Sequence, residues 1–171
     1  PGAFTRPRIF PIANRFSKIG SVPELKKENI IQVTKHAYDY LESRSSKQIS
    51  FTFSSEKKEL FVKLNNELFG WVIENLIKNS IDAMQKEGDL KLAIAPIGKK
   101  VKITISDTGK GMHKSLFKQI FKPGFTTKKR GWGLGLSLSK RIVEDYHKGK
   151  ISVKKSEIDK GTTFEILLEN I

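Results

Sequence analysis

Hydrophobic residues recur at helical spacing in two long stretches of the chain. One stretch follows Ser21 and Pro23, a pair typical of a helix start, and its apolar side chains recur every three or four residues as far as Leu41. The other runs from Asn66 to about residue 86, where Gly88 follows as a stop signal. We predict an amphipathic helix over residues 23–43 and a longer, mostly buried helix over 66–86.

Alternation of apolar and polar residues predicts six strands. They cover residues 49–53, 60–64, 90–94, 101–105, 150–154 and 163–168. We expect the first two strands to form a hairpin around the charged turn between them, and the next two to pair antiparallel. A short helix near 114–119 and a helix over 134–147 complete the pattern. The prediction is a two-layer α/β sandwich, with a mixed, mostly antiparallel sheet and helices on one face.

Length and composition fit one soluble domain. A chain of 171 residues can bury a full core, and 37% hydrophobic with 29% charged residues is typical of a globular protein. Residues 1–20 hold three prolines and two glycines and read as a linker, which leaves 21–171 as the domain. No apolar run approaches the roughly 18–20 residues that span a bilayer.

The chain is basic and lacks cysteine. A net charge of +14 attracts polyanions, although solvated lysines on helix and strand faces explain most of it. No zinc-finger or RNP-type motif accompanies the lysines, so nucleic acid is not the expected partner. The absence of cysteine excludes thiolate metal sites and cysteine nucleophiles and is compatible with a cytoplasmic location.

Polar side chains interrupt the apolar stripe of the long helix. Asn75 and Asn79 are four residues apart and Asp82 follows three later, so all three project to one side. Amide and carboxylate oxygens suit Mg²⁺, which usually keeps several waters and is shared with nucleotide phosphates. The alternative is that the two amides are buried and bonded to the backbone.

Two glycine-rich segments are further candidates. Asp107 ends a predicted strand, where its carboxylate can accept from an exocyclic amine while Gly109 and Gly111 let the backbone approach a flat ring; the same pattern also occurs in ordinary turns. Residues 131–137 open the helix over 134–147, whose free amides suit phosphate. This segment is neither a Rossmann fingerprint nor a P-loop.

The order of five short motifs carries more information than any one of them. They are Asn75-x-x-x-Asn79, Asp107-x-Gly109-x-Gly111, Phe121-Lys122-Pro123-Gly124-Phe125-Thr126-Thr127-Lys128, Gly131-x-Gly133-Leu134-Gly135-Leu136 and Gly161-Thr162-Thr163-Phe164. This series closely resembles the N, G1, F, G2 and G3 boxes of sensor histidine kinases, from about Glu67 to the C-terminus. The resemblance implies the GHKL ATP-binding fold, shared with DNA gyrase, Hsp90 and MutL.

The resemblance also implies roles for single residues in binding ATP and Mg²⁺. Asp107 accepts from the adenine amine, with Gly109, Gly111 and Thr162 around the base, while Asn79 binds Mg²⁺ and Asn75 supports the metal or the phosphates. The mobile lid comprises Phe121, Phe125, Thr126, Thr127 and Lys128, and the backbone amides for the triphosphate belong to Gly133, Leu134, Gly135 and Leu136. Phosphoryl transfer then rests on Asn75 and Asn79 as catalytic residues.

Two departures from the family pattern matter. Many members carry Lys or Arg where Asp82 stands, whereas the run Asn79-Ser80-Ile81-Asp82-Ala83-Met84 resembles the nitrogen-regulatory-type subgroup. Other cations, such as Lys78 or Lys128, must then neutralise phosphate. None of the chain's three histidines matches the phosphoacceptor motif. The resemblance therefore implies that the γ-phosphoryl group goes to a histidine on a separate dimerisation domain, absent here, in a parent homodimer that serves a response regulator. Residues 14–20 resemble the exit from the second dimerisation helix.

Three other functions compete with this interpretation. A GHKL ATPase of the gyrase or MutL kind needs a glutamate four residues before the metal-binding Asn, and Asn75 occupies that position. Glu74 lies about 100° around the helix from it. An anti-sigma-factor serine kinase shares the boxes but not the N-terminal helix and linker. A basic nucleic-acid-binding module leaves the ordered boxes unexplained. We expect a cytoplasmic kinase domain, whose parent could be an inner-membrane sensor.

Overall fold

Five strands form the central sheet of the chain. The computed structural model describes residues 22–125 and 134–171. The strands are β2 (Ile49–Ser55), β4 (Gly88–Ile97), β5 (Lys100–Asp107), β6 (Lys150–Glu157) and β7 (Gly161–Glu169), in the spatial order β2-β4-β5-β7-β6. β2 runs parallel to β4, and every other neighbouring pair is antiparallel. The predicted mixed, mostly antiparallel sheet is confirmed, as is the pairing of β4 with β5.

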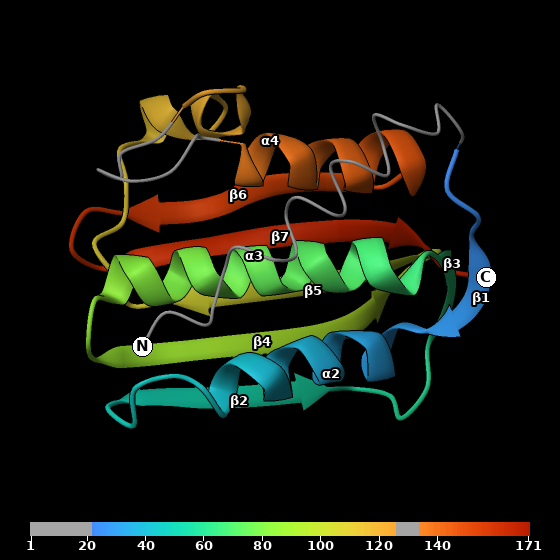
Figure 1. Cartoon of the computed structure of the whole chain (residues 1–171), viewed down its shortest axis with the longest axis horizontal. Coiled ribbons are helices and arrows are strands. Elements are labelled where there is room, and N and C mark those ends of the chain that lie inside the picture. Colours follow the sequence, from blue (N-terminus) through green and yellow to red (C-terminus); the bar gives the residue numbers. More distant parts are fainter. Residues whose placement is uncertain (1–21, 126–133) are drawn as a thin grey trace.

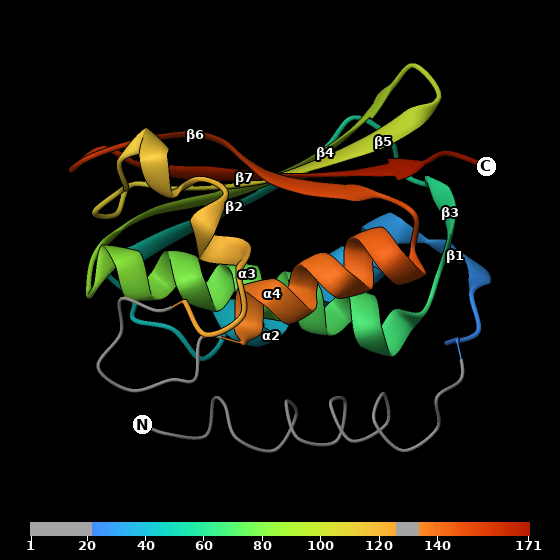
Figure 2. The same cartoon turned by 90° about the horizontal axis from the view of Figure 1, so that it is seen from above.

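The long helices of the described residues cover one face of this sheet. They are α2 (Ile30–Glu42), α3 (Asn66–Met84) and α4 (Gly135–Lys140), which continues into a π-helical segment, η3 (Arg141–Tyr146). Figure 1 shows them in front of the sheet and running roughly along its strands, and Figure 2 shows the sheet on one side and the helices on the other. The two-layer α/β sandwich is confirmed. The predicted short helix near 114–119 is two 3-10 turns, η1 (Lys114–Leu116) and η2 (Gln119–Phe121).

The core lies between the two layers. Alternate residues of β4 and β5, such as Leu90, Leu92 and Ile103, point toward the helices and are at most 1% exposed. Phe69 and Leu76 of α3 meet them and are fully buried. Each such side chain contributes about 1.5–3 kcal/mol by leaving water, so α3 is fixed against the sheet along its length.

The first helix starts later than we predicted. Residues Lys26–Asn29 form a strand, β1, which pairs antiparallel with β3 (Phe61–Leu64) in a small second sheet. α2 begins only after Asn29, whose Oδ1 accepts from the backbone N–H of Ile31 at 3.2 Å and from that of Leu60 at 3.2 Å. Asn29 therefore caps the helix and joins it to β3, a tertiary contact that the helical spacing from Pro23 could not show.

The predicted hairpin between residues 49–53 and 60–64 is wrong. Both strands exist, but β2 pairs with β4 and β3 pairs with β1. Because β3 and α3 lie between β2 and β4 in the chain, the parallel pair needs this long crossover. Burial of one face of α3 against the sheet decides the pairing, and the short charged turn does not.

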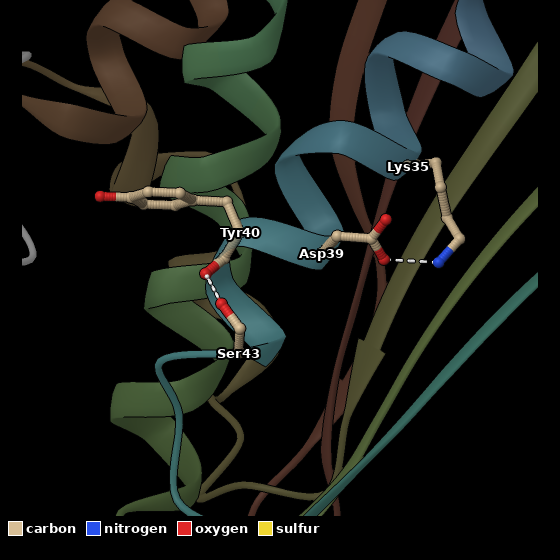
Figure 3. A network of polar contacts seen from close by, with 4 residues as sticks. All are labelled: Lys35, Asp39, Tyr40 and Ser43. Carbon is tan, nitrogen blue, oxygen red and sulfur yellow. Dashed lines mark hydrogen bonds and ion pairs between the residues drawn. The ribbon is translucent and has the colours of Figure 1, made fainter.

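The exposed side of α2 is held by local polar contacts. Lys35 and Asp39 form an ion pair one turn apart, and the Ser43 hydroxyl donates to the Tyr40 carbonyl at 3.0 Å where the helix ends. Figure 3 shows both contacts from close by. Exposed pairs of this kind contribute about 0.3–0.5 kcal/mol each, so α2 depends mainly on its buried face.

One histidine is part of the helix packing. His147 is buried, its Nδ1 donates to the Ile142 carbonyl at 2.8 Å, and its Nε2 accepts from the backbone N–H of Asn65 at 3.0 Å. Burial lowers the pKa of this imidazole, against a smaller opposing effect of the bond to Ile142. The neutral ring therefore ties the end of η3 to the start of α3.

The remaining predictions stand as follows. The two C-terminal strands and the helix near 134–147 are confirmed, with a π-helical second half. The predicted linker over residues 1–20 and most of the predicted loop over 122–133 lie outside the described residues. No helix in the described part of the chain combines the length and apolar character needed to cross a membrane.

Candidate functional site

The folded chain brings four of the five motifs to the helix-covered side of the sheet. Asn75 and Asn79 lie in the middle of α3, Asp107 ends β5, Gly135 opens α4 and Thr162 begins β7. Contacts between side chains of these elements, described below, join them in two groups. The site is therefore a product of the two-layer packing.

Asp107 forms the floor of the site. Its side chain is 7% exposed, and Oδ1 accepts from the backbone N–H of Gly109 at 2.8 Å and from that of Thr162 at 3.2 Å. Burial raises the pKa of this carboxyl, and the two amide hydrogen bonds oppose the increase. The carboxyl is thus fixed in direction at the junction of β5 and β7, as an acceptor for a ligand needs to be.

A buried hydroxyl stands beside this carboxyl. Ser80 is fully buried, and its hydroxyl lies close enough to Asp107 to favour the ionised carboxylate, which opposes the rise of the pKa that burial causes. Ser80 and Asp107 therefore form a buried polar pair at the junction of β5 and β7.

Gly109 and Gly111 serve close packing inside the chain. A Cβ on Gly109 would lie 2.6 Å from the backbone carbon of Ala83 in α3, where the next amide, that of Lys110, donates to the Ala83 carbonyl. Gly111 has a φ of +66°, and a Cβ there would lie 1.9 Å from the Glu157 carbonyl oxygen. These glycines therefore hold the loop after Asp107 against α3 and β6, and their contact with a flat ring stays a prediction.

The two asparagines of α3 lie on one side of that helix. Both are half-buried, and Asn75 Nδ2 donates to the Ser139 hydroxyl of α4 at 3.1 Å. Asn79 lies one turn further along the same side of α3. Among the described residues, no three His, Asp or Glu side chains gather as a metal site. Any metal here would depend on amide oxygen, water and the ligand itself.

The first part of the predicted lid is anchored in the core. Phe121 is buried and packs edge-on against Phe164 of β7, with ring centroids 6.4 Å apart, and Phe125 is half-buried. Thr126, Thr127, Lys128 and Gly133 lie outside the described residues. In the first turn of α4, Leu134 is 44% exposed and Gly135 and Leu136 are half-buried, so this turn is open to a ligand on one side.

Sequence reasoning missed three serines that organise the site. Ser80 lies beside Asp107, Ser139 receives Asn75, and Ser156 Oγ lies 2.7 Å from Thr162 Oγ1 and accepts from the backbone N–H of Met112. Two of them stand near a motif in the sequence: Ser80 follows Asn79 directly, and Ser139 comes four residues after Gly135. Serine is too common for that position alone to signal a role.

Comparison with known proteins assigns the chain to a family. The model of the "Histidine kinase-, DNA gyrase B-, and HSP90-like ATPase" family matches residues 65–170, more than half of the chain. The chain belongs to this family. Nucleotide binding is the property that this family of ATPase domains implies, and the Asp107 floor described above suits it.

Individual relatives are histidine kinases. The chain is 39% identical to Sporulation kinase C of Bacillus subtilis over 97 residues, which are 57% of this chain and 22% of that protein. It is 35% identical to Sensor histidine kinase ZraS of Escherichia coli over 124 residues, 72% of this chain and 26% of that one. The chain thus spans about a quarter of the length of these relatives.

Solved structures agree with the sequence relatives. The catalytic domain of histidine kinase ThkA superposes with a TM-score of 0.79 at 30% identity, covering 86% of this chain and 96% of that domain. ThkA has also been solved in complex with the response regulator TrrA, with a TM-score of 0.79 at 27% identity over 95% of this chain and 46% of that one. The chain is a histidine kinase-type ATPase domain homologous to the catalytic domains of sensor kinases.

Proposed function

We propose that this chain binds Mg²⁺-ATP and transfers the γ-phosphoryl group to a histidine on a separate dimerisation domain, in two-component signal transduction. The observation that carries the proposal is the Asp107 carboxyl, which the amides of Gly109 and Thr162 fix in direction at the junction of β5 and β7. An adenine amine donating to Asp107 would use both the acceptor and its fixed direction. Gly109, Gly111 and Thr162 then surround the base.

Asn79 is the proposed Mg²⁺ ligand. Its amide oxygen is a hard donor, and Mg²⁺ takes few protein ligands when phosphates and water fill the other positions. Asn75, one turn earlier, supports the metal or the phosphates. The bound ion would neutralise phosphate charge during transfer, while Leu134, Gly135 and Leu136 offer backbone amides together with Gly133. Phe121, Phe125, Thr126, Thr127 and Lys128 are the proposed lid, which the anchored ring of Phe121 would hold at one end.

The residue at position 75 favours transfer over hydrolysis. An ATPase of this family needs an acid to orient water, and the amide of Asn75 cannot act as a general base. In addition, its nitrogen is engaged by Ser139. In-line transfer to an imidazole needs positioning and charge neutralisation, which the proposed residues supply.

Partners follow from the same proposal. The complex of ThkA with TrrA supports a response regulator as the downstream partner of the parent protein. We propose a homodimeric parent, whose dimerisation domain carries the acceptor histidine, and a cytoplasmic location for this domain. The similarity of this chain to Sensor histidine kinase ZraS supports a sensor protein as the parent.

A binding titration tests the proposal. A non-hydrolysable ATP analogue is titrated calorimetrically into the chain with and without Mg²⁺, using Asn79→Ala and, as a matched control on the same helix, the exposed Asn66→Ala. We expect Mg²⁺ to tighten binding to the wild type and to Asn66→Ala but not to Asn79→Ala. Absence of binding to the folded wild type would overturn the proposal. Transfer of radiolabelled phosphate to a histidine-bearing dimerisation domain, added in trans, is the second step.

A further inference from the structure

Helices α3 and α4 are joined by two linked hydrogen bonds. Asn75 Nδ2 donates to Ser139 Oγ at 3.1 Å, and Ser139 Oγ donates in turn to the Gly135 carbonyl at 2.8 Å. Ser139 is fully buried, so water does not compete for its hydroxyl. The chain of bonds starts in the middle of α3 and ends on the first residue of α4.

Close contact reinforces these bonds. A Cβ on Gly135 would lie 2.7 Å from Asn75 Oδ1 and 3.1 Å from Asn75 Nδ2, so the Asn75 amide occupies the space that a side chain at position 135 would need. Only glycine at this position lets α4 approach α3 so closely. We call the unit of Asn75, Ser139 and Gly135 the α3–α4 clasp.

The clasp lies between two parts of the site that act on phosphate. Asn79, the proposed metal ligand, is one turn along α3 from Asn75. Three of the amides proposed for the triphosphate, those of Leu134, Gly135 and Leu136, belong to the first turn of α4. By contrast, the backbone hydrogen bonds to Asp107, the proposed acceptor for the base, come from Gly109 and Thr162 and involve no residue of the clasp.

We propose that Ser139 is a positioning residue, which acts with Asn75 to hold the phosphate-binding turn of α4 at a fixed distance from the metal ligand on α3. This inference rests on the proposed function. It gives Asn75 a definite role, because an amide that donates to Ser139 and packs on Gly135 supports the phosphates through α4 and not by direct coordination. Its consequence is selective: the clasp should matter for the triphosphate and not for the base.

A merely structural role for Ser139 makes a different prediction. If the hydroxyl only stabilised α4, its loss would lower the free energy of unfolding and weaken every ligand alike. Two ligands therefore separate the two roles. Adenosine reports on the base floor alone, and the Mg²⁺ complex of a non-hydrolysable ATP analogue reports on the floor and the phosphates together.

The experiment compares Ser139→Ala, Asn75→Ala and the double variant of the 171-residue chain. Ser45→Ala is the matched control, because the Ser45 hydroxyl also donates to the carbonyl four residues earlier, that of Leu41, at 2.6 Å, a bond that joins no second helix. Affinity for the ATP analogue is measured by calorimetry. Affinity for adenosine is measured by NMR titration.

We expect Ser139→Ala to lower the affinity for the ATP analogue about tenfold, the usual effect of losing one partner of a buried hydrogen bond. The affinity for adenosine should stay within about twofold of the wild-type value. Because both residues form one clasp, the double variant should lose no more than the worse single variant. Equal weakening of both ligands, additive losses, or no change in either would overturn the inference. Failure of the wild type to bind the analogue would instead count against the proposed function, and Asn75→Ala keeps the test open if Ser139→Ala does not fold.

Discussion

Replacement of Asp107 by asparagine should separate nucleotide binding from folding. The asparagine carbonyl oxygen can still accept from the amides of Gly109 and Thr162, which now reach Asp107 Oδ1 at 2.8 and 3.2 Å. What disappears is the negative charge and, at the other position, an acceptor for the base amine. Asp107→Ala would leave both buried amides without a partner, so it is the less informative variant.

The magnitude follows from the bond that is lost. Hydrogen bonds to charged groups contribute about 1.5–3 kcal/mol, so adenine affinity should fall by about 10- to 150-fold. The free energy of unfolding of Asp107→Asn should rise, although its affinity for adenine falls. Because burial raises the pKa of Asp107 above its usual 3.8, the folded carboxyl holds its proton to a higher pH than the unfolded one. Ionisation therefore costs stability as the pH rises from 3.8 through the raised pKa, and above that pH the full cost remains. Asparagine avoids this cost.

Thermal unfolding with and without ligand measures both effects. At a ligand concentration of 100 times its Kd, the wild type should gain about 2.7 kcal/mol, which corresponds to roughly 5–11 °C in Tm for a chain of this size. At the same concentration the asparagine variant should show a much smaller shift, while its ligand-free Tm at pH 7 should equal or exceed that of the wild type. Asp89→Asn, an exposed carboxyl near the same end of the sheet, is the control and should bind as the wild type does.

Two results would refute this reasoning. Unchanged affinity of Asp107→Asn would show that the carboxyl does not receive the base. A large drop in the ligand-free Tm would show that the charge of Asp107, and not only its oxygen, is needed to hold Gly109 and Thr162.

Three further predictions concern the rest of the fold. Burial lowers the pKa of His147 below its usual 6.5, so as the pH falls below that value the unfolded chain binds a proton at this histidine before the folded chain does. The free energy of unfolding, measured with urea, should therefore decrease from about pH 6.5 downward, and it should decrease less in His147→Gln. Gly111→Ala should lower the Tm markedly, since its Cβ would meet the Glu157 carbonyl at 1.9 Å with a φ of +66°, whereas Gly98→Ala, at a similar φ with open space, should cost less. Ile103→Ala, at a site 1% exposed, should cost about 2–5 kcal/mol by chemical denaturation, and a loss below 1 kcal/mol would contradict the packing described.

Much of the site could be predicted from the sequence because its residues come in short, ordered motifs. The i and i+4 spacing of Asn75 and Asn79 fixes their common side on any helix, and a carboxylate at the end of a strand next to glycines predicts a turn with a directed acceptor. The sequence also determined the two-layer class, since alternating and helical periods were both clear over the long elements. The roles of all the site residues stay predictions, and Thr126, Thr127, Lys128 and Gly133 also lie outside the described residues.

The tertiary structure decided what local patterns leave open. By the spacing of their apolar residues alone, residues 26–29 could belong to the first helix. Asn29 instead accepts a hydrogen bond from the backbone N–H of Leu60, and the helix begins after it. β2 and β3 are close enough in the chain to form a hairpin. Instead β2 pairs with β4 and β3 pairs with β1, because α3, which separates β3 from β4 in the chain, buries one face against the sheet. Ser139 reaches Asn75 across 64 residues, and the Asp107 floor needs Thr162, 55 residues away. Periodicity reports which face of an element is buried; only packing of the whole chain decides which buried faces meet, and the contacts that shape this site are of that second kind.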